Sequence, residues 1–152
     1  MFAVRLALAL AALCGSVATA GAAEIAPSDV KIVDGQVAQS LTGSPGNPAD
    51  GRKFFVDRKL GNCLACHVNP DMTDELFHGE IGPSLEGVAK RWSTEQLRAI
   101  VVNSKAVFGD RTVMPGFYSL AVGKNVRKDL VGKTILTAEQ VEAIVAYLAT
   151  LE

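Results

Sequence analysis

The sequence predicts an all-α domain in which an N-terminal and a C-terminal helix pack together, preceded by an extended leader. Two segments carry the Ser/Thr-x-x-Gln spacing of a capping box followed by apolar residues at helical intervals, one from Ser93 and one from Thr137. A third helix-like segment begins at Asn47. Between Asn47 and Ser93 lies the pentapeptide Cys63-Leu64-Ala65-Cys66-His67, which implies a group for the helices to surround.

The first 23 residues have the pattern of an export signal. Arg5 is the only charged residue before Glu24, residues 6–13 are all Leu or Ala, and small residues before Glu24 supply a cleavage site. An uncleaved membrane anchor needs about twenty apolar residues, roughly twice the length of this apolar block. Lipid attachment to Cys14 is disfavoured because a bulky residue precedes it. We therefore expect residues 1–23 to be removed and the mature protein to be periplasmic.

Residues 24–47 are expected to form an extended leader that lies across the surface of the domain. Its second half, residues 40–48, is dense in Gly, Ser, Pro and Asn, which favour turns over helices or strands. Val30, Ile32 and Val33 suit a short strand-like contact. The leader is longer than the following domain needs, so a role in docking is a natural hypothesis.

The segment after Asn47 is expected to be a helix that crosses the last helix closely. Its helically spaced positions are Gly51, Phe54, Phe55 and Arg58. A glycine beside two aromatic residues suits a close helix crossing. Tyr147 and Leu148 at the end of the C-terminal helix are the expected partners of the two phenylalanines, and this contact would bring the two ends of residues 48–152 together.

The pentapeptide at 63–67 is the pattern of covalent haem attachment. Two thiols at the spacing of Cys63 and Cys66 reach the two vinyl groups of one haem, and the adjacent His67 is carried to the iron as the proximal ligand. A closed zinc site needs four N or S ligands, but the only other cysteine is Cys14 and the only other histidine is His78. A thioredoxin-like dithiol would need a preceding strand and a βαβ pattern, neither of which is visible. The motif therefore predicts one covalent haem c.

The second axial ligand is expected in the long segment 105–136, which shows no convincing helix or strand period. Ordered loops of this length usually carry function. The segment contains Met114, and a thioether is a suitable soft ligand opposite a histidine. A shorter polar insert, residues 71–75, is expected to form one helical turn.

Met72 and His78 compete with Met114 for this position. Met72 follows His67 too soon for the chain to cross the edge of the porphyrin. His78 is a strong ligand, but a segment around Pro83 that turns back beneath His67 would offer carbonyls to its ring N–H and keep His78 on the proximal side. We therefore favour Met114 and expect His78 to be a solvated loop residue, with a His78 ligand or an open iron site as the alternatives.

The charge balance excludes several classes of partner. The formal net charge of the chain is −1, and loss of Arg5 with the signal makes it −2. Such a chain carries no basic patch for nucleic acid and no further apolar stretch for a membrane span. The remaining length suits one small domain, whose core a porphyrin would enlarge.

Over residues 48–152 the chain resembles the class I cytochrome c family. The features that carry this resemblance are the helix with Gly51, the motif at 63–67, Gly82-Pro83-Ser84-Leu85, the loop with Met114-Pro115 and the terminal helix with Tyr147. More narrowly, the chain is similar to the SoxX family. The stretches that carry this second resemblance are 37–43 with its Gln39-Ser40-Leu41-Thr42-Gly43, 45–52, 61–67, 113–115 and 117–118.

The resemblance implies ligands, partners and an activity. Cys63 and Cys66 would form the thioethers, with His67 as the proximal and Met114 as the distal iron ligand. SoxX proteins are the monohaem subunits of periplasmic SoxAX complexes, L-cysteine S-thiosulfotransferases that couple thiosulfate oxidatively to a cysteine of the carrier protein SoxY. The sulfur chemistry belongs to the SoxA partner, a dihaem or monohaem cytochrome. The present chain would accept electrons, pass them to a further cytochrome and be inactive alone.

Two functions of other classes stay open from the sequence alone. One is a free periplasmic electron carrier unconnected with sulfur, which would elute as a monomer. The other is a haem-based ligand sensor, which requires a weak or absent sixth ligand and would bind carbon monoxide when reduced.

Overall fold

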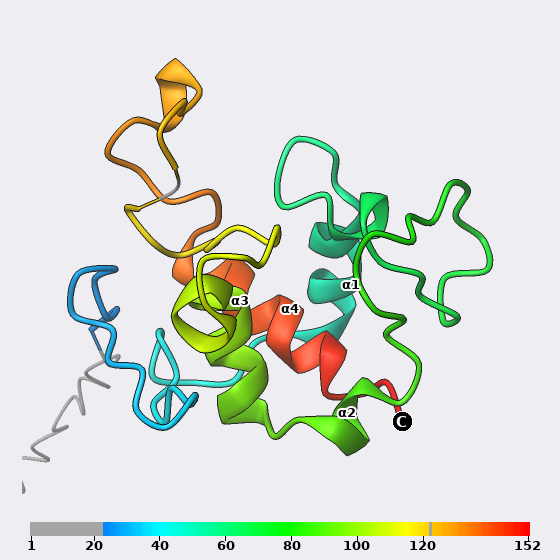
Figure 1. The fold of residues 1–152 in the computed structure, drawn as a ribbon. Helices are drawn as coiled ribbons and strands as arrows, with labels where there is room; N and C mark the ends of the chain where they lie inside the picture. Colours follow the sequence, from blue (N-terminus) through cyan, green and yellow to red (C-terminus); the bar gives the residue numbers. More distant parts are fainter. Residues whose placement is uncertain (1–22, 122) are drawn as a thin grey trace, which may run out of the picture.

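The computed structural model describes residues 23–121 and 123–152, and Figure 1 shows their arrangement. The predicted signal, residues 1–23, lies outside the described residues except for Ala23. Within the described part the fold is all-α, as predicted: it contains no β-strand and a single isolated bridge between Val33 and Gln36. The helices are α1 (Pro48–Val56), α2 (Val88–Arg91), α3 (Thr94–Phe108) and α4 (Ala138–Leu148), with 3₁₀ turns η1 (Cys63–Ala65) and η2 (Lys128–Leu130).

Local sequence signals set where the three longer helices begin. The Asn47 side chain accepts hydrogen bonds from the first backbone N–H groups of α1, and a proline opens that helix. Both predicted capping boxes are present, Ser93 with Gln96 at α3 and Thr137 with Gln140 at α4. These predictions are confirmed because a cap depends only on residues within one turn of the helix start.

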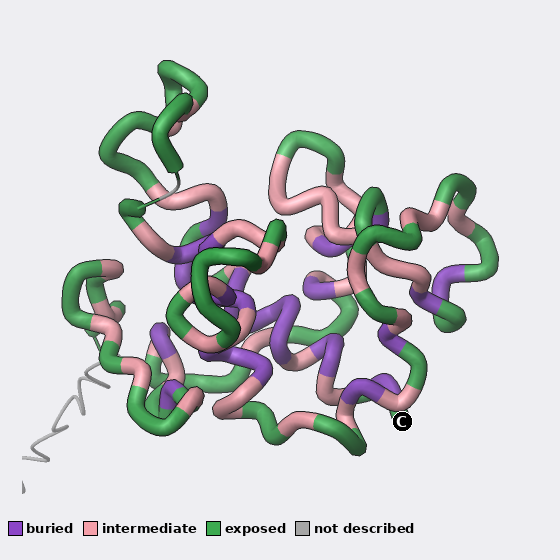
Figure 2. The backbone as a smooth tube through the Cα atoms, viewed as in Figure 1, coloured by how far each residue is buried: buried purple, intermediate pink, exposed green. Residues whose placement is uncertain are grey.

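The crossing of α1 and α4 is as close as the sequence predicts. A Cβ atom on Gly51 would overlap the carbonyl oxygen of Ala143, so no larger residue fits without moving the backbone. Phe55 packs edge-to-face against Tyr147, with ring centroids 5.8 Å apart. Figure 2 shows the buried residues gathered where α1, α3 and α4 meet. The two ends of the predicted domain are thereby joined in one core.

The leader was expected to lie across the surface of the domain. Part of it instead enters the core. Leu41 is fully buried and Val37 is 3% exposed. A buried ion pair between Arg98 of α3 and Glu142 of α4, with Nε and Oε1 2.7 Å apart, also binds the leader backbone. Glu142 accepts from Leu41 N and Arg98 donates to Val37 O, both at 2.9 Å. The leader therefore satisfies two charges that would otherwise be buried with fewer partners.

Three local features differ from what the sequence predicts. Helix α3 continues to Phe108, so the irregular segment begins later than 105. The short helix α2 was not predicted. The insert at 71–75 forms turns and no helical turn, and its Met72 is fully buried in the core.

Candidate haem site

The motif residues form a tight turn with both thiols free. The backbone N–H groups of Cys66 and His67 both donate to the carbonyl oxygen of Cys63, at 3.1 and 3.0 Å. Cys63 is partly buried and Cys66 is exposed. Burial raises the pKa of the Cys63 thiol to about 12, so this thiol is neutral at neutral pH.

A backbone segment from outside the motif holds the His67 ring. Nδ1 of His67 lies 2.8 Å from the carbonyl oxygen of Pro83, and because a carbonyl only accepts, Nδ1 carries the proton. The N–H of Gly82 donates to Cys66 O at 2.7 Å, which fixes the segment under the ring. A Cβ atom on Gly82 would overlap the imidazole, at 2.6 Å from Nδ1. This is the predicted proximal arrangement: Nε2 is left free to bind a metal while Nδ1–H is held by a carbonyl.

Helix α3, which supports the loop with Met114, is broken at Asn103. This residue has φ −155° and ψ 85°, which is not helical, and its side chain accepts from Ala106 N to restart the helix. The carbonyls of Val101 and Val102 consequently lose their usual helical partners. They accept instead from Phe117 N and Tyr118 N, both at 3.1 Å, so the break turns two helix carbonyls into anchors for the loop that contains Met114.

Further contacts fix this loop on α3. Ser104 is fully buried and its hydroxyl donates to the carbonyl oxygen of Met114 at 2.5 Å. Lys105 Nζ donates to Thr112 O at 2.6 Å. A Cβ atom on Gly116 would lie 3.0 to 3.1 Å from neighbouring atoms, which leaves little room. Met114 itself is partly buried and packs against the core. These contacts hold the loop against α3 although it has no regular secondary structure.

The two competing ligand candidates are engaged elsewhere. His78 is partly buried: its Nδ1 accepts from Asn69 N at 3.2 Å, and Nε2 lies 3.1 Å from Met72 O. The expectation that His78 is a solvated loop residue is thus wrong, because backbone groups occupy both ring nitrogens. Met72 is a core residue with no exposed surface. Met114 stays the predicted distal ligand.

A polar network ties the segment after the motif to the helix pair. The fully buried Asn69 donates to the Tyr147 hydroxyl at 2.9 Å, and that hydroxyl donates to Asp71 at 2.8 Å. Arg52 of α1 pairs with Asp74 and lies 3.7 Å from Asp71. Burial and the bond to Asp71 raise the pKa of Tyr147 above its ordinary value. The sequence reasoning missed this network, whose members lie 76 and 78 residues apart along the chain.

Asn103 was also missed, although the sequence contains a signal for it. Asn is a poor residue for a helix interior because its side chain competes for backbone hydrogen bonds.

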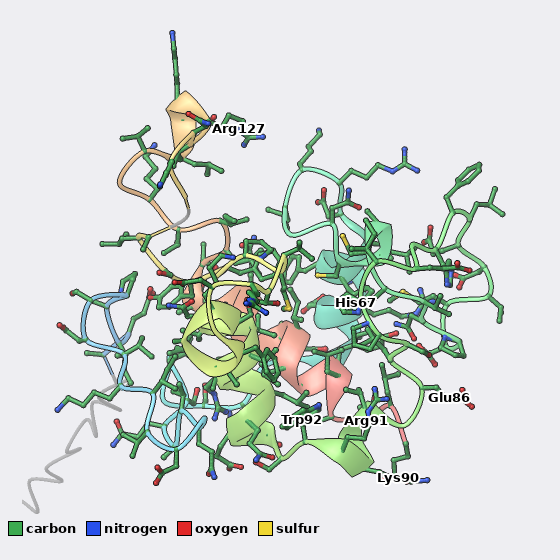
Figure 3. All side chains as sticks on the ribbon, viewed as in Figure 1. His67, Glu86, Lys90, Arg91, Trp92 and Arg127 are labelled. Atoms are coloured by element: carbon green, nitrogen blue, oxygen red, sulfur yellow. The ribbon has the colours of Figure 1, made fainter. Side chains whose placement is uncertain are left out.

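In the described residues, no group of three or more His, Cys, Asp or Glu side chains gathers as an ion site. Two free thiols, an oriented imidazole and a glycine that clears space beside it fit a covalent haem. Figure 3 labels His67 among the side chains near the middle of the molecule.

Comparison with known proteins gives the same fold. The chain matches the cytochrome c family over residues 48–152. A chain of SoxXA from P. pantotrophus is 42% identical with a TM-score of 0.78, and the match covers 85% of this chain and 98% of that one. The c-type cytochrome SorU from Sinorhizobium meliloti is 27% identical with a TM-score of 0.44, over 68% and 87% of the two chains. No curated protein sequence matches. Across the described ranges, no helix has the length and apolar character to cross a membrane.

Proposed function

This chain belongs to the cytochrome c family as a SoxX-type monohaem cytochrome with covalently bound haem c, and from this premise we propose that it is the electron-accepting subunit of a periplasmic SoxAX-type complex. The observation that carries the proposal is the extent of the match to SoxXA. That match covers 85% of the chain, more than residues 48–152 alone supply. The similarity therefore includes leader sequence that the cytochrome family itself does not require.

We assign the haem contacts to four residues. Cys63 and Cys66 form the two thioethers, His67 is the proximal ligand and Met114 the distal ligand. When bound, the haem supplies reversible one-electron transfer. His67 is oriented through its Nδ1–H on the Pro83 carbonyl, and Met114 is presented by a loop anchored on the break in α3. With His67 and Met114 both holding the iron, substrate would have no place at it.

The proposed reaction explains why a partner is required. Joining thiosulfate to a carrier cysteine forms one S–S bond and releases one proton and two electrons. The described part of this chain offers only Cys63 and Cys66, which the haem consumes. The sulfur step therefore belongs to a SoxA-type cytochrome acting on a SoxY-type carrier, and this chain accepts electrons and hands them on to another cytochrome.

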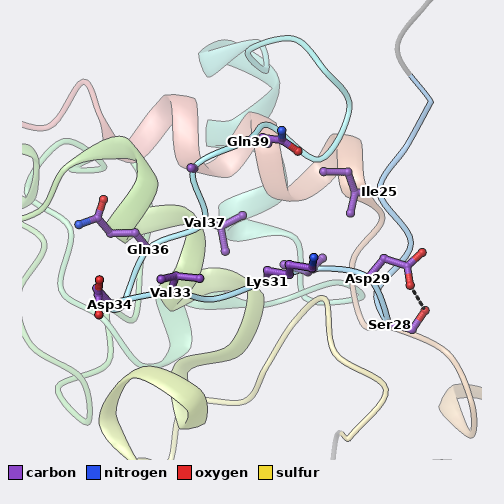
Figure 4. Close-up of a pocket in the computed structure, with 11 residues that line it drawn as sticks. Ile25, Ser28, Asp29, Lys31, Val33, Asp34, Gln36, Val37 and Gln39 are labelled. Carbon is purple, nitrogen blue, oxygen red and sulfur yellow. Dashed lines mark hydrogen bonds between the residues drawn. The ribbon is translucent and has the colours of Figure 1, made fainter.

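The leader is the segment that we assign to the SoxA-type partner. Residues 25–39 line a hollow of about 980 Å³ whose walls include Ile25, Val33 and Val37 (Figure 4). Val33 is 63% exposed. Because part of the leader is anchored in the core, this surface is fixed relative to the haem site. The match to SoxXA beyond the cytochrome domain supports the choice of occupant.

Haem reduction tests the proposed function directly. Purified holoprotein mixed with thiosulfate and a SoxY-type carrier should stay oxidised, and its absorbance should change to that of the reduced haem only when a SoxA-type cytochrome is added. A carrier that lacks its cysteine is the control and should give no reduction. Thiosulfate-dependent reduction of this chain alone would overturn the proposal. Failure to associate with a SoxA-type partner in gel filtration would leave a free electron carrier.

A further inference from the structure

The loop of residues 74–81 holds large apolar side chains in water. Leu76 is 72% exposed, Phe77 82% and Ile81 71%. Phe77 also has a φ of 64°, a left-handed conformation that is unusual for an aromatic residue. Clustered exposed apolar side chains of this size on a small domain indicate a binding surface.

The backbone of the 74–81 loop is fixed to the haem motif. Gly79 N donates to Leu64 O at 2.9 Å, and Gly82 N, just beyond the loop, donates to Cys66 O at 2.7 Å. A Cβ atom on Gly79 would overlap the carbonyl of Ala65, so the loop and the motif lie in direct contact. The backbone of Asn69 and Met72 holds the two ring nitrogens of His78. The apolar side chains are thus presented beside the haem attachment site by a rigid support, which lowers the entropy cost of binding.

The charges of this loop that no ion pair engages are acidic. Residues 60–89 contain five acidic residues and no Lys or Arg. Asp71 and Asp74 are engaged by Arg52, whereas no ion pair in the described ranges involves Glu75 or Glu80. Residues 109–136, by contrast, contain five basic and two acidic residues. The loop therefore presents Glu75 and Glu80 outside any ion pair of the described residues beside the haem motif, and a basic partner would complement them.

We propose that the 74–81 loop is the docking site for the electron-accepting protein, a small redox protein with Lys and Arg side chains around its exposed redox centre. This proposal rests on the proposed function, since it adds a second partner to the SoxAX-type complex. Figure 1 shows the loop (green) on the right and the leader (blue to cyan) on the left of the molecule, so the two partners have separate surfaces. Glu75 and Glu80 steer the acceptor, and Leu76, Phe77 and Ile81 form the contact.

Electron transfer to a lysine-rich mitochondrial cytochrome c tests the docking site. The second-order rate is measured by stopped flow from reduced holoprotein, alone and in complex with a SoxA-type partner, at several salt concentrations. The double variant E75Q/E80Q should lower the rate by about tenfold at low salt and flatten its salt dependence. The matched double variant D110N/E139Q changes the charge equally at two exposed residues outside both the loop and the leader, and it should keep the steering.

The apolar contact has its own pair of variants. Phe77→Ser should lower the rate at high and low salt alike, whereas Val131→Ser, at a residue 64% exposed outside the loop and the leader, should leave it unchanged. Neither loop variant should alter the visible spectrum or co-elution with the SoxA-type partner. Unchanged rates in both loop variants would overturn the proposal, and so would loss of co-elution, which would assign the loop to the SoxA interface. Failure of the wild-type chain to associate with that partner would instead contradict the proposed function.

Discussion

The two sides of the haem site are built in different ways. On the proximal side, Cys63, Cys66 and His67 occupy one turn, and the segment that orients His67 follows within twenty residues of it. On the side that we propose to be distal, Met114 lies on a loop held by carbonyls that the Asn103 break releases from α3. The proximal side thus depends on a compact stretch of chain, and the distal side on hydrogen bonds between a broken helix and a loop. Changes to the two sides should therefore differ in kind and in size.

The largest effect is expected from Gly82→Ala on the proximal side. The new methyl group would overlap the His67 ring, so either the imidazole or the Pro83 segment must move. Overpacking of this kind costs about 1–3 kcal/mol in the free energy of unfolding. Urea denaturation of the holoprotein measures it. The distal counterpart, Gly116→Ala, meets atoms no nearer than 3.0 Å and should cost less; a greater loss for Gly116→Ala would contradict the comparison.

An intermediate effect is expected from the distal anchors. Asn103→Ala favours a continuous helix, which would take back the Val101 and Val102 carbonyls from the loop. Ser104→Ala removes the hydroxyl that binds Met114 O. Each lost hydrogen bond is worth about 1 kcal/mol, roughly a factor of five in an equilibrium constant. Cyanide should therefore bind the ferric holoprotein roughly fivefold more tightly in Ser104→Ala and at least as tightly in Asn103→Ala.

The control for these variants lies on the same helix. Ser93→Ala removes the cap of α3 and should lower the free energy of unfolding by about 1 kcal/mol without changing cyanide affinity. Equal cyanide binding in Ser93→Ala and Asn103→Ala would show that general loss of helix stability, and not the break, controls the loop.

The smallest effect concerns two tyrosines. Tyr147 belongs to the polar network after the motif, and Tyr118 follows the loop with Met114. Burial, followed by a hydrogen bond to a carboxylate, raises the pKa of both Tyr147 and Tyr118 above 10.0. A raised folded-state pKa means that the folded protein holds its proton longer, so this stabilisation is complete below about pH 10 and declines as the pH rises further. Tyr147→Phe and Tyr118→Phe should each make the free energy of unfolding less dependent on pH in that range. Urea midpoints at about pH 9 and about pH 11 measure this, and unchanged slopes would contradict the assignment.

The same contrast explains what the sequence could predict. The caps at Asn47, Ser93 and Thr137 and the carbonyl partner of His67 were predicted and are present, because each depends on residues near in sequence or on a motif of known geometry. The close crossing at Gly51 was predicted from one glycine beside aromatic residues.

The missed features depend on contacts that no sequence pattern reveals, most of them between distant segments. The Arg98–Glu142 pair buries part of the leader, and its members lie 44 residues apart. His78 is held by the backbone of Asn69 and Met72, which are near in sequence but show no periodicity. The role of the Asn103 break depends on a loop that is distant in sequence, which binds the carbonyls of Val101 and Val102. Sequence patterns therefore predicted the starts of the three longer helices and the carbonyl partner of His67. Only the structure revealed the contacts that support the loop with Met114.

The central claim is that His67 and Met114 close the iron from opposite sides. The weak near-infrared charge-transfer band of the ferric holoprotein, which reports methionine ligation, tests it most directly. The wild-type protein should show the band. Met114→Ala should abolish it and let the reduced protein bind carbon monoxide, whereas Met72→Leu and His78→Ala should retain the band. A band that survives Met114→Ala but disappears in Met72→Leu or His78→Ala would contradict the account.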